Sequence, residues 1–287
     1  MGNLISQAFP PAAAFTESAL PSGSLKDRVF IVTGASAGVG KELARLLYSR
    51  DGTVYLAARS AERSSAAMSW IREAHPESQG RLEFLYLELA DLESVKPAAD
   101  EFLGKEKRLD VLFNNAGVMV PPQGSTTKQG YELQLGTNCL GHYLFTKLVT
   151  PLMVQTAQSS EAGSVRVVWV SSSAVMGAPS GGVDMANLEY QTDKFAFQKY
   201  AVSKAGNVLH ALQFRNLYEK HGIVSVSLNP GNLKSELQRH SGWLGELVTR
   251  LITYPAVNGA YTEFFAGLSP DVRNLKQNEW GKIVLEP

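Results

Sequence analysis

The chain reads Thr33-Gly34-Ala35-Ser36-Ala37-Gly38-Val39-Gly40-Lys41-Glu42 directly after a short apolar run, Val29 to Thr33. The glycines form a G-x-x-x-G-x-G loop between a predicted strand and a predicted helix. Glycine is needed where the backbone turns with positive φ and where a pyrophosphate lies against peptide N–H groups. The N-terminus of the following helix offers further donors. A tight turn without a ligand is the alternative, but the position of the loop favours nucleotide binding.

Short β-branched runs alternate with longer helical patterns from Asp27 onward, which is typical of a parallel sheet built from β-α-β units. Several runs are apolar at consecutive positions, as expected of strands that helices cover on both faces. We therefore expect an α/β fold, a single doubly wound parallel-sheet (Rossmann-type) domain over residues 27–287. Residues 1–26, rich in Pro, Gly and Ser, are expected to form a flexible leader. The predicted strands are Val29 to Thr33, Thr53 to Ala57, Arg81 to Leu87, Asp110 to Phe113, Val165 to Ser171, Val224 to Leu228 and Lys282 to Leu285.

The composition limits the classes of function. In 287 residues, 27 Lys and Arg balance 27 Asp and Glu, so the chain lacks the basic excess of a dedicated nucleic-acid binder. A hydrophobic share of 44% is enough for a folded core. The single cysteine, Cys139, cannot form an internal disulfide, and the five histidines lack metal-ligand spacing. These features predict a cytoplasmic protein without a structural metal.

The sequence contains no apolar stretch of the roughly 18 residues that a membrane span requires. Met1-Gly2-Asn3-Leu4-Ile5-Ser6 matches the pattern for N-myristoylation at Gly2. One acyl chain gives only weak, reversible membrane association. An unmodified leader is the alternative.

The end of the second predicted strand indicates which dinucleotide fits. NAD sites usually place an acidic residue there to bind the ribose 2′-hydroxyl, whereas a 2′-phosphate requires cations. Here the strand ends in Ala57-Ala58-Arg59-Ser60, with Arg63 just beyond. A guanidinium can bind a phosphate bidentately and stack on adenine. The pattern favours NADP(H), with a solvated surface arginine as the alternative.

Further polar groups suggest catalysis. Tyr200 and Lys204 stand four residues apart in a helical pattern, so they share one helix face. A phenol titrates at about 10 in isolation, and an adjacent ammonium favours its anion. Asn114-Asn115-Ala116-Gly117 and Ser171-Ser172-Ser173 follow predicted strands, at the edge where open α/β sheets bind ligands. Each piece alone also has an ordinary explanation as a helix surface, turn or cap.

In this order the segments resemble the short-chain dehydrogenase/reductase family. The resemblance covers nearly the whole domain, and its combination of motifs is specific although each motif alone is weak. Residues 130–144 further resemble the retinol dehydrogenase-like branch, and many fungal reductases of natural-product pathways look similar there. The matching segments are Thr33 to Gly40, Asn114 to Gly117, Asn138, the serines after the strand, Tyr200 to Lys204, and Pro230-Gly231-Asn232-Leu233-Lys234-Ser235.

The resemblance implies roles for the matched residues. Tyr200 would be the general acid or base, and Lys204 would lower its pKa and bind the nicotinamide ribose. Ser172, or else Ser173, would hold the substrate oxygen, and Asn138 would position a water that links Lys204 to solvent. An acid is usual near the adenine, normally aspartate, where this chain has glutamate. The expected cofactor-binding residues are Gly34, Ser36, Gly38, Val39, Gly40, Arg59, Glu88, Leu89, Asn115, Ala116, Gly117, Tyr200, Lys204, Pro230, Gly231, Leu233 and Ser235.

Two segments are expected to shape the substrate cleft. Residues 235–255 would form an apolar lid, with plain core packing or a dimer face as alternatives. The insertion Val175 to Phe197 would form another wall. Both favour a hydrophobic small-molecule substrate.

We therefore expect an NADP(H)-dependent oxidoreductase acting on a hydrophobic ketone, aldehyde or secondary alcohol, as a carbonyl reductase of secondary (natural-product) metabolism. A non-redox reaction on the same scaffold (dehydration, epimerisation or cyclisation) and an NADP(H)-binding regulator are the alternatives. By analogy with the family, helices at Tyr131 to Val154 and Tyr200 to Lys220 would form a homodimer or homotetramer.

Overall fold

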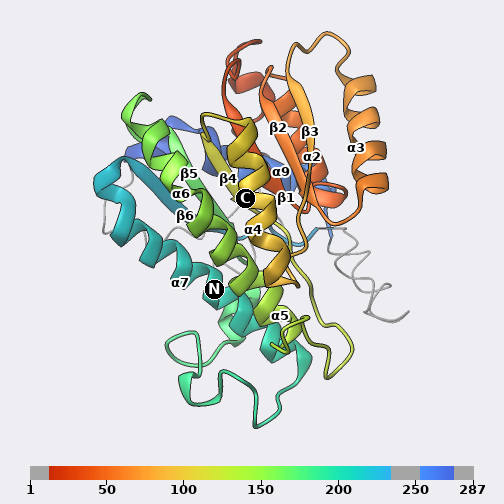
Figure 1. Cartoon of the computed structure of the whole chain (residues 1–287), viewed down its shortest axis with the longest axis vertical. Coiled ribbons are helices and arrows are strands. Elements are labelled where there is room, and N and C mark those ends of the chain that lie inside the picture. Colours follow the sequence, from red (N-terminus) through yellow and green to blue (C-terminus); the bar gives the residue numbers. More distant parts are fainter. Residues whose placement is uncertain (1–12, 234–252, 275–287) are drawn as a thin grey trace.

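A computed structural model of the chain describes residues 13–233 and 253–274. They form a six-stranded parallel sheet in the order β3-β2-β1-β4-β5-β6, with helices on both faces (Figure 1). This strand order confirms the expected doubly wound α/β fold. The strands are β1 (Val29–Thr33), β2 (Thr53–Ala58), β3 (Arg81–Tyr86), β4 (Val111–Asn114), β5 (Val165–Val170) and β6 (Ile223–Leu228). The longer helices are α2 (Gly38–Tyr48), α3 (Ala61–Ala74), α4 (Leu92–Lys105), α6 (His142–Gln158), α7 (Ala196–Tyr218) and α9 (Ala256–Leu268). The short helices are η1 (Glu17–Ala19), α5 (Leu133–Leu135), η2 (Gly136–Gly141), η3 (Ser173–Gly177), η4 (Met185–Asn187), η5 (Glu219–His221) and η7 (Pro270–Asn274).

The six predicted strands within the described residues are all present, and no strand end differs from the prediction by more than one residue. Both ends of β4 lie one residue later than predicted. The carboxylate of Asp110, just before β4, accepts hydrogen bonds from the backbone N–H of Val29 at 2.8 Å and from the guanidinium of Arg108. The strand predicted at 282–285 lies outside the described residues.

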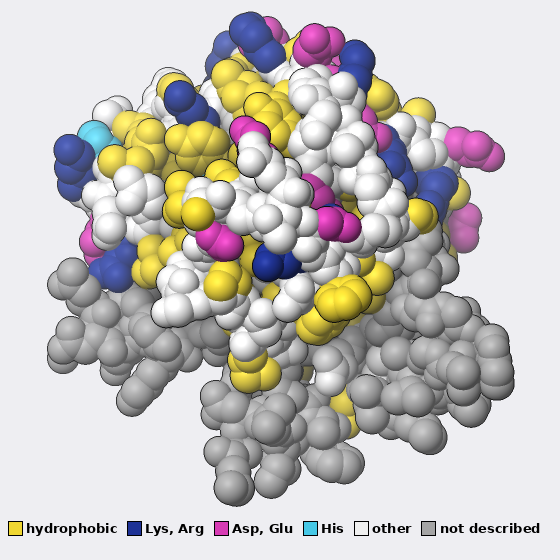
Figure 2. Space-filling view, turned by 90° about the horizontal axis from the view of Figure 1, so that it is seen from below, with side chains coloured by type: hydrophobic (Ala, Val, Ile, Leu, Met, Phe, Trp, Pro, Cys, Tyr) yellow, Lys and Arg dark blue, Asp and Glu magenta, His cyan; other side chains and the backbone are white. Residues whose placement is uncertain are grey.

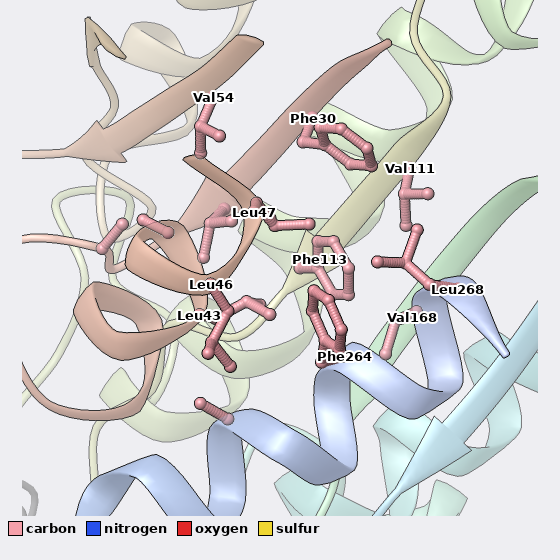
Figure 3. Packing of buried hydrophobic residues seen from close by; sticks show 14 of the residues in the cluster. Phe30, Leu43, Leu46, Leu47, Val54, Val111, Phe113, Val168, Phe264 and Leu268 are labelled. Carbon is pink, nitrogen blue, oxygen red and sulfur yellow. The ribbon is translucent and has the colours of Figure 1, made fainter. Parts of the chain in front are cut away.

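Two hydrophobic cores enclose the sheet. One lies between the sheet and helices α2, α3 and α9, and the other between the sheet and helices α4, α6 and α7. Figure 3 shows the first core, where Phe113 of β4 and Phe264 of α9 lie close together beside leucines of α2. All five residues of β1 are buried, which explains its uninterrupted apolar sequence.

Two apolar side chains of the predicted leader contact the rest of the protein. The ring of Phe15 lies 5.6 Å from that of Phe264, and Leu25 is 1% exposed. Arg50 also donates to the carbonyl of Glu17 at 2.8 Å. Residues 13–26 therefore make specific contacts with the domain, although most of their side chains are exposed or only partly buried.

The two long helices predicted around the site have different limits. The helix that carries Tyr200 begins four residues earlier, at Ala196. The helix expected from Tyr131 starts as the short α5 and passes through the π-helical turn η2 before α6. Within the described residues no helix is long and apolar enough to cross a bilayer.

A buried arginine fastens the end of α9 to the sheet. Arg166 of β5 is fully buried and donates to three backbone carbonyls, those of Gly163 at 2.9 Å and of Ala266 and Ser269 at 2.8 Å. The last carbonyls of a helix have no partner within the helix, so the guanidinium satisfies groups that burial would otherwise leave unpaired.

We expect Arg166→Met to lower the free energy of unfolding by about 3 kcal/mol, because buried carbonyls lose their donors. Urea unfolding followed by circular dichroism measures the change. The matched control is Arg81→Met, which removes an exposed ion pair with Glu106 and should cost less than about 1 kcal/mol. Equal losses in the two variants would show that the buried hydrogen bonds do not hold α9.

Candidate active site

The glycine loop after β1 has the backbone geometry that its sequence predicts. Gly34 and Gly38 adopt positive φ values of 70° and 56°. At Gly40, an added Cβ would lie 2.5 Å from Nδ2 of Asn115 and 2.9 Å from the carbonyl oxygen of Gly34. The glycines therefore allow the loop to turn and to pack closely against the segment after β4.

A cavity of about 230 Å³ opens between this loop and the ends of β2, β3 and β4. It brings together most of the residues predicted to bind the cofactor, from four separate loops. The glycines leave backbone N–H groups without side chains beside them, and two arginines, Arg59 and Arg63, stand at the rim. Both features suit the phosphates of a dinucleotide. The predicted residues that line it are Gly34, Ser36, Gly38, Val39, Gly40, Arg59, Glu88, Leu89, Asn115, Ala116 and Gly117. The cavity is also lined by Arg63, noted above beside Arg59, and by residues that sequence analysis did not select, namely Ala37, Ala57, Ala58, Leu87, Val118 and Thr137.

The signal for Arg63 was its place just beyond Arg59, at the end of the second predicted strand. Side chains of the alanines carry no chemistry that a motif search would detect. Arg59 is largely exposed and its guanidinium lies 3.6 Å from the carboxylate of Glu88. That carboxylate also accepts the backbone N–H of Ala90.

The remaining predicted cofactor residues lie elsewhere. Pro230, Gly231 and Leu233 follow β6 and are not among the residues that line this cavity. Gly231 has a φ of 88°, and Leu233 pairs with Tyr254 in an isolated β-bridge. Ser235 and most of the predicted lid lie outside the described residues.

Thr33, which sequence analysis did not select, ties the first strand to the loop after β4. Its hydroxyl oxygen accepts the backbone N–H groups of Asn115 and Ala116, both at 2.9 Å. Its carbonyl accepts the side-chain amide of Asn115 at 2.7 Å. Three hydrogen bonds from one residue thus fix the floor of the cavity.

Tyr200 and Lys204 meet Ser172 at the end of β5. The three come from α7 and from the start of η3, and both α7 side chains are almost completely buried. The side chain of Ser172 lies close enough to the Tyr200 hydroxyl to lower the pKa of the phenol, which favours Ser172 over Ser173 as the serine of the site. The ammonium of Lys204 donates to the carbonyl of Val170 at 2.9 Å and lies 5.8 Å from the centre of the Tyr200 ring.

The protonation of this pair differs from the expectation. Burial raises the pKa of Tyr200 to about 12, and the side chain of Ser172 only partly opposes this. Burial lowers the pKa of Lys204 to about 8, against the opposing charges of Cys139 and Glu263. We expected the ammonium to lower the pKa of the phenol, whereas desolvation of the phenolate is the largest influence on this pKa and raises it.

Asn138 connects the two parts of the site. A Cβ at Gly117, in the cavity wall, would lie 3.4 Å from Nζ of Lys204 and 3.5 Å from Oδ1 of Asn138. Asn138 is fully buried in the π-helical turn η2. Its side chain donates to the carbonyl of Val118 at 3.0 Å and to Oγ of Ser203 at 2.9 Å, and accepts from the N–H of Val118. Such π-helical turns occur frequently at functional sites.

Comparisons with known proteins agree with this geometry. A sequence model of the family described as short chain dehydrogenase matches residues 28–242. A short-chain dehydrogenase/reductase of Phomopsis amygdali is 50% identical over 97% of this chain and 84% of its own length. Another, of Emericella nidulans, is 47% identical over 96% of this chain and 89% of its own length. A solved short-chain dehydrogenase from Sphingobium yanoikuyae in complex with NADPH shares the fold, with a TM-score of 0.66 and 20% identity over 86% of each chain.

We expect Gly40→Ala to weaken NADPH binding at least tenfold and to lower the free energy of unfolding by about 2 kcal/mol, because the new methyl group collides with backbone. Fluorescence titration and urea unfolding measure the two effects. Gly104→Ala is the control: nothing lies within 4 Å of its added Cβ, so helix α4 should gain slightly in stability. An unchanged affinity in Gly40→Ala would show that close packing of the loop is not needed for binding.

Proposed function

The chain belongs to the short-chain dehydrogenase/reductase family, and on that premise we propose that it is an NADP(H)-dependent carbonyl reductase for a hydrophobic ketone or aldehyde. The observation that carries the proposal is that Ser172 and the buried Lys204 both lie beside the buried phenol of Tyr200, next to the dinucleotide cavity. The similarity to fungal relatives supports a role in secondary metabolism. A closer relation to the retinol dehydrogenase-like branch stays a prediction.

The charges at the cavity rim support NADP(H). Arg59 and Arg63 line the cavity at the end of β2 and the start of α3, where an adenosine 2′-phosphate would lie. The carboxylate nearest to Arg59 belongs to Glu88 at the end of β3 and is already engaged by that guanidinium and a backbone N–H. The NADPH bound to the Sphingobium yanoikuyae enzyme is consistent with this assignment.

Each residue of the site has a defined task in the proposed reduction. Bound NADPH would supply the hydride to the carbonyl carbon. Ser172 would donate a hydrogen bond to the substrate oxygen and hold it beside the phenol. Tyr200, whose pKa is raised to about 12, keeps its proton at neutral pH and can donate it to the developing alkoxide. Lys204, with a pKa of about 8, remains largely protonated at pH 7 and stabilises negative charge at this point.

Exposed hydrophobic side chains near the site support a hydrophobic substrate. The predicted insertion from Val175 to Phe197, which ends in the first turn of α7, carries four of them at 56–83% exposure: Met176, Met185, Phe195 and Phe197. The ring of Phe197 lies 6.4 Å from that of Tyr200, so one of these side chains reaches the reacting group. Figure 2, which views the molecule from below, shows hydrophobic side chains interspersed among polar ones on this face.

We expect the protein to bind NADPH at least tenfold more tightly than NADH, and Arg59→Ser to reduce this preference by about tenfold through lost charge-assisted hydrogen bonds. The affinity for NADH should stay within about twofold. Side-by-side fluorescence titrations measure both ligands. Arg72→Ser, at an exposed arginine in the last turn of α3 that does not line the cavity, is the control. A wild-type preference for NADH would overturn the NADP(H) assignment.

Tyr200→Phe should lower kcat at least about a hundredfold, because general acid catalysis commonly contributes that much. NADPH affinity should change little, since only a hydroxyl is lost. The assay follows NADPH consumption with a panel of aryl and long-chain ketones and aldehydes. Tyr131→Phe, at an exposed tyrosine, is the control. If Tyr200→Phe turned over a substrate at the wild-type rate, the phenol would have no part in the reaction.

A further inference from the structure

His142 is a buried histidine to which the proposed reaction assigns no task. It is the first residue of α6, directly after the π-helical turn that carries Asn138, and it is fully buried. Its Nε2 lies 2.9 Å from the hydroxyl oxygen of Thr33, and its Nδ1 lies 3.1 Å from the backbone carbonyl oxygen of Asn138. The imidazole therefore joins the end of β1 to the helix turn beside Lys204.

The partners determine which nitrogen carries the proton. A carbonyl oxygen can only accept, so Nδ1 must donate to Asn138. Burial lowers the pKa of His142 to about 3, which keeps the ring neutral and leaves Nε2 as an acceptor. The hydroxyl of Thr33 must then donate to Nε2, although the carbonyl of Phe113 lies 3.2 Å away as a competing acceptor.

This assignment completes the hydrogen bonding of Thr33. A hydroxyl donates once and accepts twice. With its proton directed at His142, the two lone pairs of Thr33 are free for the backbone N–H groups of Asn115 and Ala116, which they receive at 2.9 Å. The ring thus orients the hydroxyl that holds the cavity floor and, through its other nitrogen, holds the π-helical turn.

We propose that His142 is a positioning residue whose Nδ1–H tautomer holds the Asn115–Ala116 segment through Thr33 and the Asn138 turn through its carbonyl. Nε2 thereby acts, through Thr33, on the floor of the dinucleotide cavity, and Nδ1 acts, through the Asn138 turn, on the surroundings of Lys204. The consequence for catalysis rests on the proposed function. No other neutral side chain donates at the δ position and accepts at the ε position in one rigid plane, so the two contacts require histidine.

Two conservative variants separate the two contacts. In His142→Asn the amide nitrogen can replace Nδ1 and keep the contact with Asn138, while the contact with Thr33 is lost. In His142→Gln the amide oxygen can replace Nε2 and keep Thr33 oriented, while the contact with Asn138 is lost. We expect His142→Asn to weaken NADPH binding about tenfold with little change in kcat. We expect His142→Gln to lower kcat about tenfold with NADPH affinity close to wild type.

His221→Asn and His221→Gln are the matched controls, because this histidine is exposed in η5, just beyond the C-terminal end of α7. They should leave both parameters unchanged. If the two His142 variants lost affinity and kcat to the same extent, or lost neither, the proposed division of tasks would be wrong.

The tautomer of His142 can be measured by NMR without an activity assay. In the protein labelled with ¹⁵N-histidine, long-range ¹H–¹⁵N spectra at about pH 6 should show a neutral His142 ring protonated at Nδ1, whereas ordinary exposed histidines are largely charged there. Burial also lowers the pKa of His210 to about 4, so a second neutral ring is expected, and its signals are identified by their loss in His210→Gln. A His142 ring that is protonated at Nε2, or that is charged at this pH, would overturn the proposal. Absence of any NADPH binding by the wild-type protein would instead contradict the proposed function, while the ring spectrum would still decide the hydrogen-bond assignment.

Discussion

Parallel pairing of the six strands is the constraint on which the rest of the structure depends. Because every strand runs in the same direction, the loops that follow β1, β2, β4 and β5 leave from one edge of the sheet. β1 pairs with β2 on one side and with β4 on the other. Successive strands are therefore added on one side of β1 up to β3, and on its other side from β4 onward. Loops that leave these neighbouring strands diverge, and the cavity opens at that point. The location of the site thus follows from topology before any side chain is considered.

Topology does not fix the shape of the loops at this edge, and side chains complete it. The N–H groups beyond the last strand residues have no partner strand, so they need other acceptors. The hydroxyl oxygen of Thr33 accepts two of these N–H groups, those of Asn115 and Ala116. At the other end of β1, the carboxylate of Asp110 accepts the N–H of Val29. At the end of α9, the guanidinium of Arg166 donates to backbone carbonyls that have no partner within the helix. Each of these polar residues is buried because backbone groups require it.

Sequence predicted the features that depend on periodicity or on a motif. Strand positions followed from apolar runs, and the glycine loop and the spacing of Tyr200 and Lys204 predicted groups that the fold brings to one edge of the sheet. Features that depend on a partner remote in sequence could not be predicted. Thr33 and His142 are separated by 109 residues, and neither residue type alone indicates a contact. Ser172 was chosen from its place after the strand, and the position of the phenol beside it supports that choice over Ser173.

Burial explains why the protonation of the site differed from the prediction. In water the phenol and the ammonium titrate at similar values, about 10 and about 10.4. Loss of solvent disfavours the charged form of each, which is the phenolate for Tyr200 and the ammonium for Lys204, so the two pKa values move apart to about 12 and about 8. As pH rises, Lys204 therefore loses its proton before Tyr200 does. Under the proposed function, the phenol therefore still carries its proton at neutral pH when it meets the developing alkoxide.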